Sequence, residues 1–469
     1  MKKKPAPQPD VEERERDNEL PEGWAQTSLS EICDINPPKP AIHALRPDAP
    51  VTFVPMPAVD AKLGAITVAD TRPFSEVRKG YTAFQEGDVI MAKITPCMEN
   101  GKAAIARHLH NRLGFGSTEF HVLRPRDRVL GDFVYHFIRQ ASYRKAAESE
   151  MTGSVGQKRV PADFIESTII PLAPYEEQRR ITKTLTELIT KNRTTRGRLE
   201  RVPRILKTFR QSVLAAACSG RLTEDWSQAH GELEWEDRKI GDFCLDSFYG
   251  PRFGRDEYTA EGIPTIRTTD FTDDGRISLK DPPRISIPEA KKEKFLLKPD
   301  DLLVTRTGSI GKMAIFRESY PALPSAYLIR FRFSREILVD FVFVWLMSPR
   351  GQELLGLNST AVTQPNINAE SIRELPVPFP SITEQHEIVR RVDALFNLAN
   401  AIEKRVEAAT KRADRLTQSI LAKAFRGEIV PTEAELARRE RRTYEPASAL
   451  LARIRAEREK STITINHPR

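Results

Sequence analysis

The chain has 469 residues, of which 39% are hydrophobic and 29% are charged, and its formal net charge is +8. At roughly 100–200 residues per domain, this length predicts two to four domains with real cores, which excludes wholesale disorder. The sequence has no run of about 18 apolar residues, so no membrane span is expected. The basic balance suggests an anionic partner, with nucleic acid as the first guess.

The four cysteines are scattered, without the paired spacing of a zinc ribbon or a disulfide framework. They are Cys33, Cys97, Cys218 and Cys244. This usage fits a reducing compartment, so we expect a cytoplasmic protein. Residues 1–20 start basic but lack the apolar core of a secretory signal, and we expect them to form a disordered tail.

Residues 21–174 are expected to form a first mixed α/β domain. Strands are predicted where β-branched and aromatic residues gather, at residues 51–56, 88–94 and 120–125. Residues 131–149, GDFVYHFIRQASYRKAAES, predict a helix.

Residues 175–219 predict one long helix. Alternating steps of four and three from Ile181 meet an apolar residue at eight of ten positions, which indicates a coiled-coil seam. Pro203 lies inside this helix, so a kink or break is expected there. The apolar seam positions are Ile181, Leu185, Leu188, Leu199, Val202, Leu206, Phe209 and Val213.

Residues 220–380 predict a second mixed α/β domain with strands at 264–269, 301–307 and 327–333 and a helix at 339–356. A second long helix follows at 381–428, and all ten of its seam positions are apolar. The bulkier ones are Ile388, Val392, Leu395, Ile402, Val406, Leu416 and Ile420. Residues 429–469 read as a charged tail with one short helix, behind a flexible stretch.

The chain is an internal duplication with a period near 207. Glu177 and Gln178 recur as Glu384 and Gln385, and Ile181 recurs as Ile388. The offset is constant around this frame but drifts to 210 and 213 further upstream, as expected for a common scaffold with divergent loops. We therefore predict an α+β fold of two tandem mixed α/β domains, joined by two long helices that form an intramolecular antiparallel coiled coil. The alternative is two amphipathic helices that each lie on their own domain.

We find no convincing catalytic, cofactor-binding or metal site. The segment NPPK at 36–39 resembles the Asn-Pro-Pro-aromatic motif of amino-methyltransferases, but Lys39 replaces the aromatic residue that stacks on the flipped base. The segment TGSIGK at 307–312 lacks two residue types that a phosphate-binding loop requires. The histidines and cysteines show no metal-ligand spacing. The sequence therefore favours binding or assembly.

Several motifs in a fixed order point to a family. LPEGW at 20–24 precedes the first globule, and PLAPYEEQ and PFPSITEQ precede the two long helices. The helices end in VLAAACSGRLT and ILAKAFRGEIVP, and EPASALLARIRAE follows near the C-terminus. Over nearly its whole length the chain resembles the DNA specificity (S) subunit of type I restriction-modification systems.

The resemblance implies that each globule is a target recognition domain that reads one half of a split DNA sequence. It also implies that the coiled coil spaces these domains and docks two methyltransferase (M) subunits, to which restriction/translocase (R) subunits can be added. The S subunit itself is non-catalytic in this family. S-adenosylmethionine, ATP and magnesium are expected on the partner subunits, and no cofactor on this chain. Helices of about 40 residues are roughly 60 Å long, against about 34 Å for one turn of DNA.

Candidate DNA contacts are polar or basic residues on loops. Arginine and lysine can pair with guanine edges, and asparagine and glutamine with adenine edges, although most contacts go to phosphates. The alternative for each is a solvated loop. In the first domain the candidates are Lys93, Thr95, Asn100, Lys102, Gln157, Lys158 and Arg159. In the second they are Arg252, Arg255, Arg306, Thr307, Ser309, Lys312, Gln364, Asn366 and Asn368.

Two other classes of function stay open at this point: a self-sufficient DNA methyltransferase, and a coiled-coil scaffold without DNA specificity. The divergence of the loops between the repeats favours the specificity subunit over a scaffold. The two helix regions carry a net charge of +10 and the two globules −2. The globules therefore cannot rely on bulk charge, and we expect weak DNA binding by the isolated subunit with a modest salt dependence.

Overall fold

The computed structural model describes residues 20–40, 45–154, 156–231, 234–254, 257–272, 274–306, 311–357 and 367–466. The tail expected at 1–20 lies, except for Leu20, outside these residues. The chain divides into two compact units. Unit 1 comprises Met1–Arg198 with Thr410–Arg469, and unit 2 comprises Leu199–Ala409. Each unit therefore contains one globule and parts of the long helices.

The globule of unit 1 contains two four-stranded sheets. The strands predicted at 51–56, 88–94 and 120–125 form in the structure as β3, β8 and β11. One sheet is antiparallel, in the order β2 (Cys33–Ile35), β11 (Phe120–Pro125), β8 (Val89–Ala92) and β9 (Ala103–Ile105). The other has the order β6 (Asp70–Pro73), β3 (Pro50–Val54), β10 (Leu113–Gly116) and β7 (Thr82–Gln85). Two smaller pairs are β1 (Ala25–Ser28) with β12 (Ile169–Leu172), and β4 (Val59–Asp60) with β5 (Ala65–Ile66).

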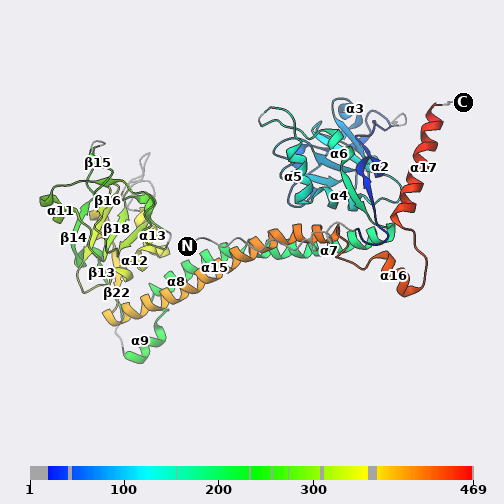
Figure 1. Ribbon diagram of the computed structural model, residues 1–469. Helices are drawn as coiled ribbons and strands as arrows, with labels where there is room; N and C mark the ends of the chain where they lie inside the picture. Colours follow the sequence, from blue (N-terminus) through cyan, green and yellow to red (C-terminus); the bar gives the residue numbers. More distant parts are fainter. Residues whose placement is uncertain are drawn as a thin grey trace, which may run out of the picture. The chain divides into compact units, whose positions relative to one another are not determined.

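Most helices of unit 1 bury residues in the core beside the β2-β11-β8-β9 sheet, whereas α3 packs against β3 and β6 (Figure 1). The short helices are α2 (Leu29–Ile32), α3 (Phe74–Val77), α4 (Gly131–Ile138), α5 (Ala141–Ser149) and α6 (Ala162–Ser167). The longer ones are α7 (Tyr175–Leu199) and, from the other end of the chain, α16 (Glu433–Glu440) and α17 (Ala447–Asn466). Where the sequence predicts one helix over 131–149, the structure has α4 and α5, because Gln140 adopts an extended conformation.

Unit 2 repeats this architecture. Its strands include those predicted at 264–269, 301–307 and 327–333. One sheet has the order β14 (Cys244–Tyr249), β21 (Leu328–Phe333), β18 (Asp301–Thr305) and β19 (Met313–Phe316). The other has the order β15 (Tyr258–Thr259), β17 (Arg284–Ile285), β16 (Ile263–Ile266) and β20 (Leu323–Pro324). The remaining pair is β13 (Glu236–Lys239) with β22 (Pro376–Phe379).

Helices again surround the larger core of unit 2. They are α8 (Val202–Ala217), α9 (Glu224–His230), α10 (Ile240–Phe243), α11 (Glu289–Phe295), α12 (Val339–Met347), α13 (Pro349–Leu357), α14 (Ala369–Arg373) and the first part of α15 (Ile382–Ala424). The helix predicted at 339–356 is also split, because Ser348 precedes Pro349 and a residue before proline avoids the helical region.

The long helices pair antiparallel within each unit. In unit 1, the Asn192 side-chain amide on α7 donates to the Ala413 carbonyl and the Thr417 hydroxyl of α15, both at 2.8 Å. In unit 2, Arg210 on α8 donates to Asn400 of α15 at 2.7 Å. Also in unit 1, Arg196 of α7 pairs with Asp414 of α15 at 2.9 Å, so the residue number rises on α7 while it falls on α15, and the antiparallel pairing of the helices is confirmed (Figure 1).

Most predicted seam positions face inward, but one prediction is wrong. Leu416 is 49% exposed, whereas Ala413 and Leu421 are buried and Thr417 contacts Asn192. A straight helix repeats every 3.6 residues, so its buried stripe drifts away from a strict seven-residue repeat. The buried or half-buried seam residues are Ile181, Leu185, Leu188, Leu199, Val202, Leu206, Phe209, Val213, Ile388, Val392, Leu395, Ile402, Val406 and Ile420.

The break expected near Pro203 is present, because α7 ends at Leu199 and α8 begins at Val202. The C-terminal region differs from the prediction of one short helix behind a flexible stretch. It has two helices, α16 and α17, and α17 is longer than expected. Its apolar residues, among them Leu450 and Ile454, are buried in the core of unit 1. Within the described part of the chain, no helix is long and apolar enough to cross a membrane.

Candidate nucleic-acid interface

The Glu–Gln pair at the start of α7 fastens this helix to the globule of unit 1. The Glu177 carboxylate accepts hydrogen bonds from the Trp24 indole Nε1 at 2.8 Å and from the backbone N–H of Glu433 at 2.7 Å. The Gln178 side chain accepts a bond from the N–H of Leu130, the residue before α4, at 3.1 Å. Both side chains are fully buried, so each of these bonds satisfies a group that water cannot reach. Burial raises the pKa of Glu177.

The same arrangement recurs at the start of α15 in unit 2. Glu384 accepts hydrogen bonds from the Trp235 indole Nε1 at 2.9 Å and from the hydroxyls of Thr223 and Ser227 at 2.8 and 2.6 Å. Gln385 accepts a bond from the N–H that precedes α12 at 2.8 Å. The duplicated Glu–Gln signature is therefore a structural joint that fixes each globule on its helix.

Three loops meet in unit 1 beyond the end of β8. The backbone N–H of Lys93 donates to the Glu119 carbonyl at 2.9 Å, and the Lys93 carbonyl accepts from the Val160 N–H at 2.9 Å. The Thr95 N–H donates to the Lys158 carbonyl at 3.0 Å. The structure thus brings together the candidates around residues 93–102 and 157–159, which are far apart in the sequence.

An ion pair fixes part of this cluster. Arg159 donates to the Glu119 carboxylate through Nε at 3.0 Å and Nη2 at 2.8 Å, and its Nη1 donates to the Gln157 carbonyl at 2.9 Å. The hydrogen bonds from Arg159 lower the pKa of Glu119. Because its donors are occupied within the domain, Arg159 is placed to hold the loop that presents its exposed neighbours, Gln157 and Lys158.

A second polar group beneath these loops was not among the predicted residues. The Asn36 side-chain amide donates to His121 Nδ1 at 3.0 Å, and His121 Nε2 donates to the Val160 carbonyl at 2.9 Å. Burial lowers the pKa of His121, so this ring is neutral near pH 7. Asn36 also has a left-handed backbone with φ of 48°. The only sequence signal was its place in the NPP turn after β2.

The other candidates in unit 1 divide by exposure. Asn100 is exposed, as are Gln157 and Lys158. The Lys102 ammonium instead donates to the Met56 carbonyl at 3.0 Å, and the Thr95 hydroxyl donates to the Glu99 carboxylate at 2.9 Å. These bonds connect the loop after β8 to itself and to a neighbouring turn.

In unit 2, Arg306 follows β18 as Lys93 follows β8. Its guanidinium lies 4.7 Å from the centre of the Tyr249 ring, and the Tyr249 hydroxyl accepts a bond from the Ala369 N–H at 3.0 Å. Tyr249 is 40% exposed and neighbouring Tyr327 is 60% exposed. Sequence reasoning missed both tyrosines, although each lies at an end of a predicted or observed strand.

The same backbone bonds position the two clusters. The Arg306 N–H donates to the Tyr327 carbonyl at 3.0 Å, and the Arg306 carbonyl accepts from the Ile367 N–H at 3.0 Å. These match the bonds of Lys93 with Glu119 and Val160. Convergent loops therefore present basic, polar and aromatic side chains at equivalent ends of two sheets, β2-β11-β8-β9 in unit 1 and β14-β21-β18-β19 in unit 2.

The remaining candidates of unit 2 are not all placed. Arg252 and Lys312 are exposed. Asn368 is exposed and caps α14, since its side chain accepts a bond from the Ser371 N–H at 2.7 Å. The other candidates lie outside the described residues: Arg255, Thr307, Ser309, Gln364 and Asn366.

The segments that hinted at catalysis do not form a site among the described residues. The Lys39 ammonium of the NPPK segment donates to the Arg78 carbonyl at 2.8 Å. Most of the TGSIGK segment lies outside the described residues. No group of three histidine, cysteine or acidic side chains within the described ranges could hold a metal ion.

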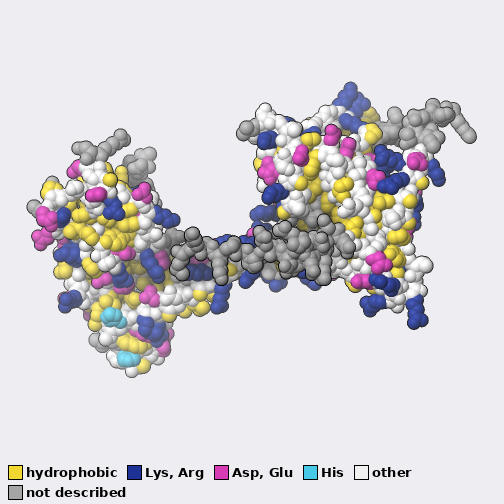
Figure 2. Space-filling model, viewed as in Figure 1, with side chains coloured by type: hydrophobic (Ala, Val, Ile, Leu, Met, Phe, Trp, Pro, Cys, Tyr) yellow, Lys and Arg dark blue, Asp and Glu magenta, His cyan; other side chains and the backbone are white. Residues whose placement is uncertain are grey.

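Charges of both signs are interspersed over the visible face of each globule (Figure 2). This distribution agrees with the net charge of −2 that the two globules share. Neither globule therefore presents a broad basic surface on this face.

The family model for the type I restriction modification DNA specificity domain matches the chain twice, over residues 21–204 and 232–412. The chain is 36% identical to the EcoBI specificity subunit of Escherichia coli, with 71% of this chain and 73% of that protein covered. It is 31% identical to the StySPI specificity subunit of Salmonella potsdam over 94% of this chain and 96% of that protein.

A solved structure agrees on the fold. The HsdS subunit from Thermoanaerobacter tengcongensis superimposes with a TM-score of 0.61 at 21% identity, covering 87% of this chain and 98% of that one. The duplicated globules, the paired helices and the two family matches account for nearly the whole chain. The chain therefore belongs to the DNA specificity subunits of type I restriction-modification systems, which recognise the DNA sequence and are not themselves catalytic.

Proposed function

We propose that the convergent loops of each globule read one half of a bipartite DNA target. The equivalent backbone bonds at Lys93 and Arg306 are the observation that carries this proposal. They fix the same loop positions in both globules, while the side chains differ: a lysine beside a Glu–Arg pair in unit 1, and an arginine beside two tyrosines in unit 2. A common frame with different side chains is what two unlike half-sites require.

The partners of this proposal are two methyltransferase subunits, each docked on the paired helices near one globule, and restriction/translocase subunits that join them. The helices offer exposed apolar residues for such contacts, with Ile205 at 62% and Leu398 at 55% in unit 2 and Leu416 at 49% in unit 1. The name of one similar structure concerns assembly of the type I system, which supports a multi-subunit complex.

We assign S-adenosylmethionine, ATP and magnesium to those partners and none of them to this chain. The methyltransferase subunits would modify adenine, and the restriction subunits would translocate and cut unmodified DNA. The complex would work in the cytoplasm, where its DNA substrate lies.

Co-expression with methyltransferase subunits, followed by sequencing of methylated DNA, tests the proposal. A bipartite motif with a fixed gap is the expected result. A matched deletion then tests whether the helices set that gap. Residues 192–198 and 411–417 face one another, so removing both blocks shortens the coiled coil by one heptad.

That deletion removes about 10 Å of helix, which corresponds to about three base pairs of DNA. The half-sites should stay the same while the gap shrinks. Removing residues 192–198 alone serves as the control, because the unmatched helices should not support methylation at any spacing. Methylation with an unchanged gap after the double deletion would contradict a spacing role.

A further inference from the structure

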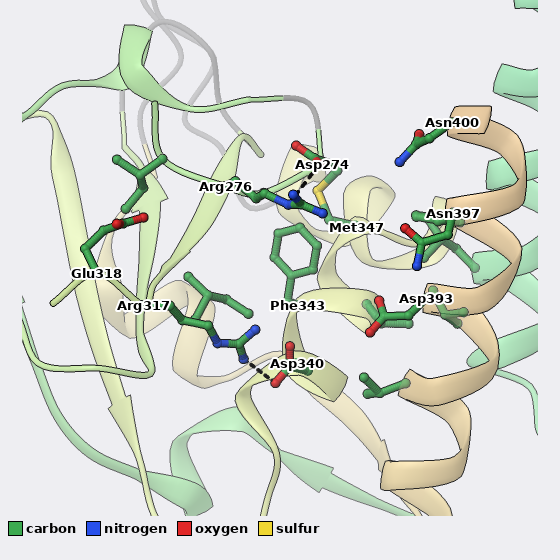
Figure 3. Close-up of a pocket in the computed structure, with 18 residues that line it drawn as sticks. Asp274, Arg276, Arg317, Glu318, Asp340, Phe343, Met347, Asp393, Asn397 and Asn400 are labelled. Atoms are coloured by element: carbon green, nitrogen blue, oxygen red, sulfur yellow. Dashed lines mark hydrogen bonds and ion pairs between the residues drawn. The ribbon is translucent and has the colours of Figure 1, made fainter. Parts of the chain in front are cut away.

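Unit 2 contains a pocket of about 470 Å³ where its globule meets α8 and α15 (Figure 3). Phe343 and Met347 of α12 and Phe396 of α15 supply apolar walls. Asp393 and Asn397, one turn apart on α15, project toward Phe343 (Figure 3). The pocket thus combines an aromatic wall with carboxylate and amide acceptors.

The charges of the pocket favour a cation. Its lining has four carboxylates, on Asp274, Glu318, Asp340 and Asp393, against the guanidinium groups of Arg276 and Arg317. Both arginines are already paired, Arg276 with Asp274 and Arg317 with Asp340. A phosphate would therefore meet an excess of negative charge.

Two acceptors in the pocket are unused. Among the described residues, the Asp393 carboxylate and the Asn397 side chain make no hydrogen bond or ion pair. Burial, and then the charge of Asp340, raise the pKa of Asp393, and the charges of Arg317 and Arg276 lower it. A cation beside this carboxylate would relieve that unfavourable environment.

The equivalent place in unit 1 is filled by a guanidinium of the chain itself. Arg139, at the end of α4, donates to the Tyr135 hydroxyl at 2.6 Å and to the Ala61 carbonyl at 2.9 Å. Its guanidinium also lies 5.4 Å from the centre of the Tyr135 ring. The Tyr135 hydroxyl in turn donates to the Gly64 carbonyl at 2.8 Å.

The two sites correspond residue by residue on α4 and α12, whereas Thr186 and Thr190 of α7 stand in unit 1 at the positions of Asp393 and Asn397. Asp132, Tyr135 and Arg139 in GDFVYHFIR match Asp340, Phe343 and Met347 in VDFVFVWLM. Asp132 pairs with Arg107 as Asp340 pairs with Arg317.

A glycine with positive φ faces the aromatic ring in each unit. A Cβ atom on Gly64 would lie 1.9 Å from the Tyr135 hydroxyl, and one on Gly275 would lie 2.2 Å from the Phe343 ring. On α12 itself, the difference is that Met347 brings no guanidinium into unit 2.

We propose that this pocket of unit 2 receives an arginine side chain from another protein subunit. The guanidinium would donate to the Asp393 carboxylate through two of its N–H groups and to Asn397 through a third, with one face on Phe343. Arginine suits this site better than lysine because its planar fork matches a carboxylate and stacks on an aromatic ring. The idea builds on the proposed docking of partners on the helices, but its test needs neither DNA nor those partners.

The test uses the full-length chain and the peptide acetyl-Gly-Arg-Gly-amide, with binding followed by ligand-observed NMR. The comparison peptide carries citrulline, which has nearly the same shape without the charge. We expect the arginine peptide to bind at least about tenfold more tightly than the citrulline peptide, because the charge-assisted bonds are lost. Asp393→Asn should reduce this preference by a similar factor.

Reciprocal substitutions separate the pocket from other acidic surface. Met347→Arg should fill the pocket from within, as Arg139 does in unit 1, and abolish peptide binding. Met347→Leu is the matched control, because it keeps the size and apolarity and should retain the preference for the arginine peptide. Arg139→Met should not add a second binding site, because Thr186 and Thr190 stand in unit 1 at the positions of Asp393 and Asn397.

Thermal unfolding of each variant shows whether it is folded before binding is measured. Equal binding of the arginine and citrulline peptides, no binding of either, or full binding by folded Met347→Arg would overturn the proposal. These outcomes would leave DNA recognition untouched, because methylation of the bipartite target is measured separately with the assembled complex.

Discussion

Each unit has an equivalent buried glutamate at the start of a long helix, but different parts of the chain donate the hydrogen bonds to it. In unit 2, Glu384 is held by the segment that directly follows α8, through Thr223 and Trp235. In unit 1, Glu177 is held by Trp24 from the start of the chain and by the backbone of Glu433 from its end. The segment after α8 therefore completes the globule of unit 2, in which α15 begins. The segment after α15 completes the globule of unit 1, in which α7 begins.

Comparison of the two units shows which features recur in both copies of the repeat and which differ between them. The buried carboxylate and its indole donor recur, so they belong to the scaffold. Helix α17 buries apolar residues only in unit 1, and the arginine at position 139 has methionine as its counterpart. Unit 1 thus depends on residues more than 400 positions apart, whereas unit 2 is built from one continuous stretch, Leu199–Ala409.

The largest expected effect comes from the contact that unit 1 alone possesses. Leu450 of α17 is 1% exposed within the core of unit 1. Leu450→Ala should lower the stability of unit 1 by about 2–5 kcal/mol, through lost burial and the cavity left behind. Hydrogen exchange measured by mass spectrometry should show faster exchange in unit 1 and little change in unit 2. Ser448→Ala, on the exposed face of α17, is the control. Equal loss of protection in both units would contradict their independence.

The buried joint of unit 2 comes next. Glu384→Ala removes the acceptor for one indole N–H and two hydroxyls, and leaving such groups unsatisfied is costly. We expect a loss of about 2–3 kcal/mol, seen as a lower denaturant midpoint and as faster exchange around residues 223–235. Glu384→Gln keeps one side-chain oxygen and should lose less. If Ala and Gln have the same effect, the shape of the side chain matters at this joint and its hydrogen bonds do not.

Substitutions in the convergent loops, at Lys93 or Arg306, should have a smaller effect on DNA binding, and each should affect only one half-site. Arg306→Ala should weaken binding of the assembled methyltransferase to its target by about 1–3 kcal/mol and relax specificity in only one half. Lys93→Ala should do the same for the other half. Arg350→Ala, an exposed arginine paired with Glu353, tests for a general loss of positive charge. Unchanged affinity and specificity in both loop variants would remove these loops from the interface.

The scaffold could be predicted from the sequence because repetition makes it visible twice. The period of 207, the paired seams and the break before Pro203 each follow from local patterns. The seam prediction was wrong at Leu416, because the helix does not keep the strict seven-residue repeat over its full length. The C-terminal region was underestimated, since nothing local in EPASALLARIRAE shows that its leucines enter a core formed by residues 20–185.

For the candidate DNA interface, the sequence predicted which loops take part but not all of the residues that meet there. The candidates near 93, 158 and 306 do lie together on convergent loops within their units, as expected for polar residues between strands. Asn36, His121 and Tyr249 were missed because long-range strand pairing brings them there. Lys102 was predicted as a DNA contact, and its bond to the Met56 carbonyl shows a structural use that no local pattern indicates.

The smallest expected effect concerns the pH dependence of stability. Unit 2 has a carboxylate that contributes to this dependence, and unit 1 has none at the corresponding position. Hydrogen bonds from Arg390 and Arg391 lower the pKa of Glu387 to about 2, from an ordinary value near 4.5. A carboxylate whose pKa is lower in the folded state stabilises that state above about pH 4.5, and the contribution is lost as the pH falls toward 2. The equivalent residue in unit 1 is Arg180, which pairs with Glu433.

Glu387→Gln should therefore reduce the stability of unit 2 by about 0.5–1 kcal/mol at pH 7, the size expected of two short-range helix ion pairs. The difference from wild type should shrink as the pH falls from 4.5 toward 2, because the carboxylate of the unfolded state becomes protonated there while that of the folded state keeps its charge down to about pH 2. Denaturant unfolding at several pH values measures this difference, and Glu176→Gln, an exposed helix ion pair in unit 1, is the matched control. If the difference in stability between Glu387→Gln and wild type stays constant across this pH range, Glu387 contributes through packing. The difference in charge between Glu387 and Arg180 would then not affect the stability of the two units.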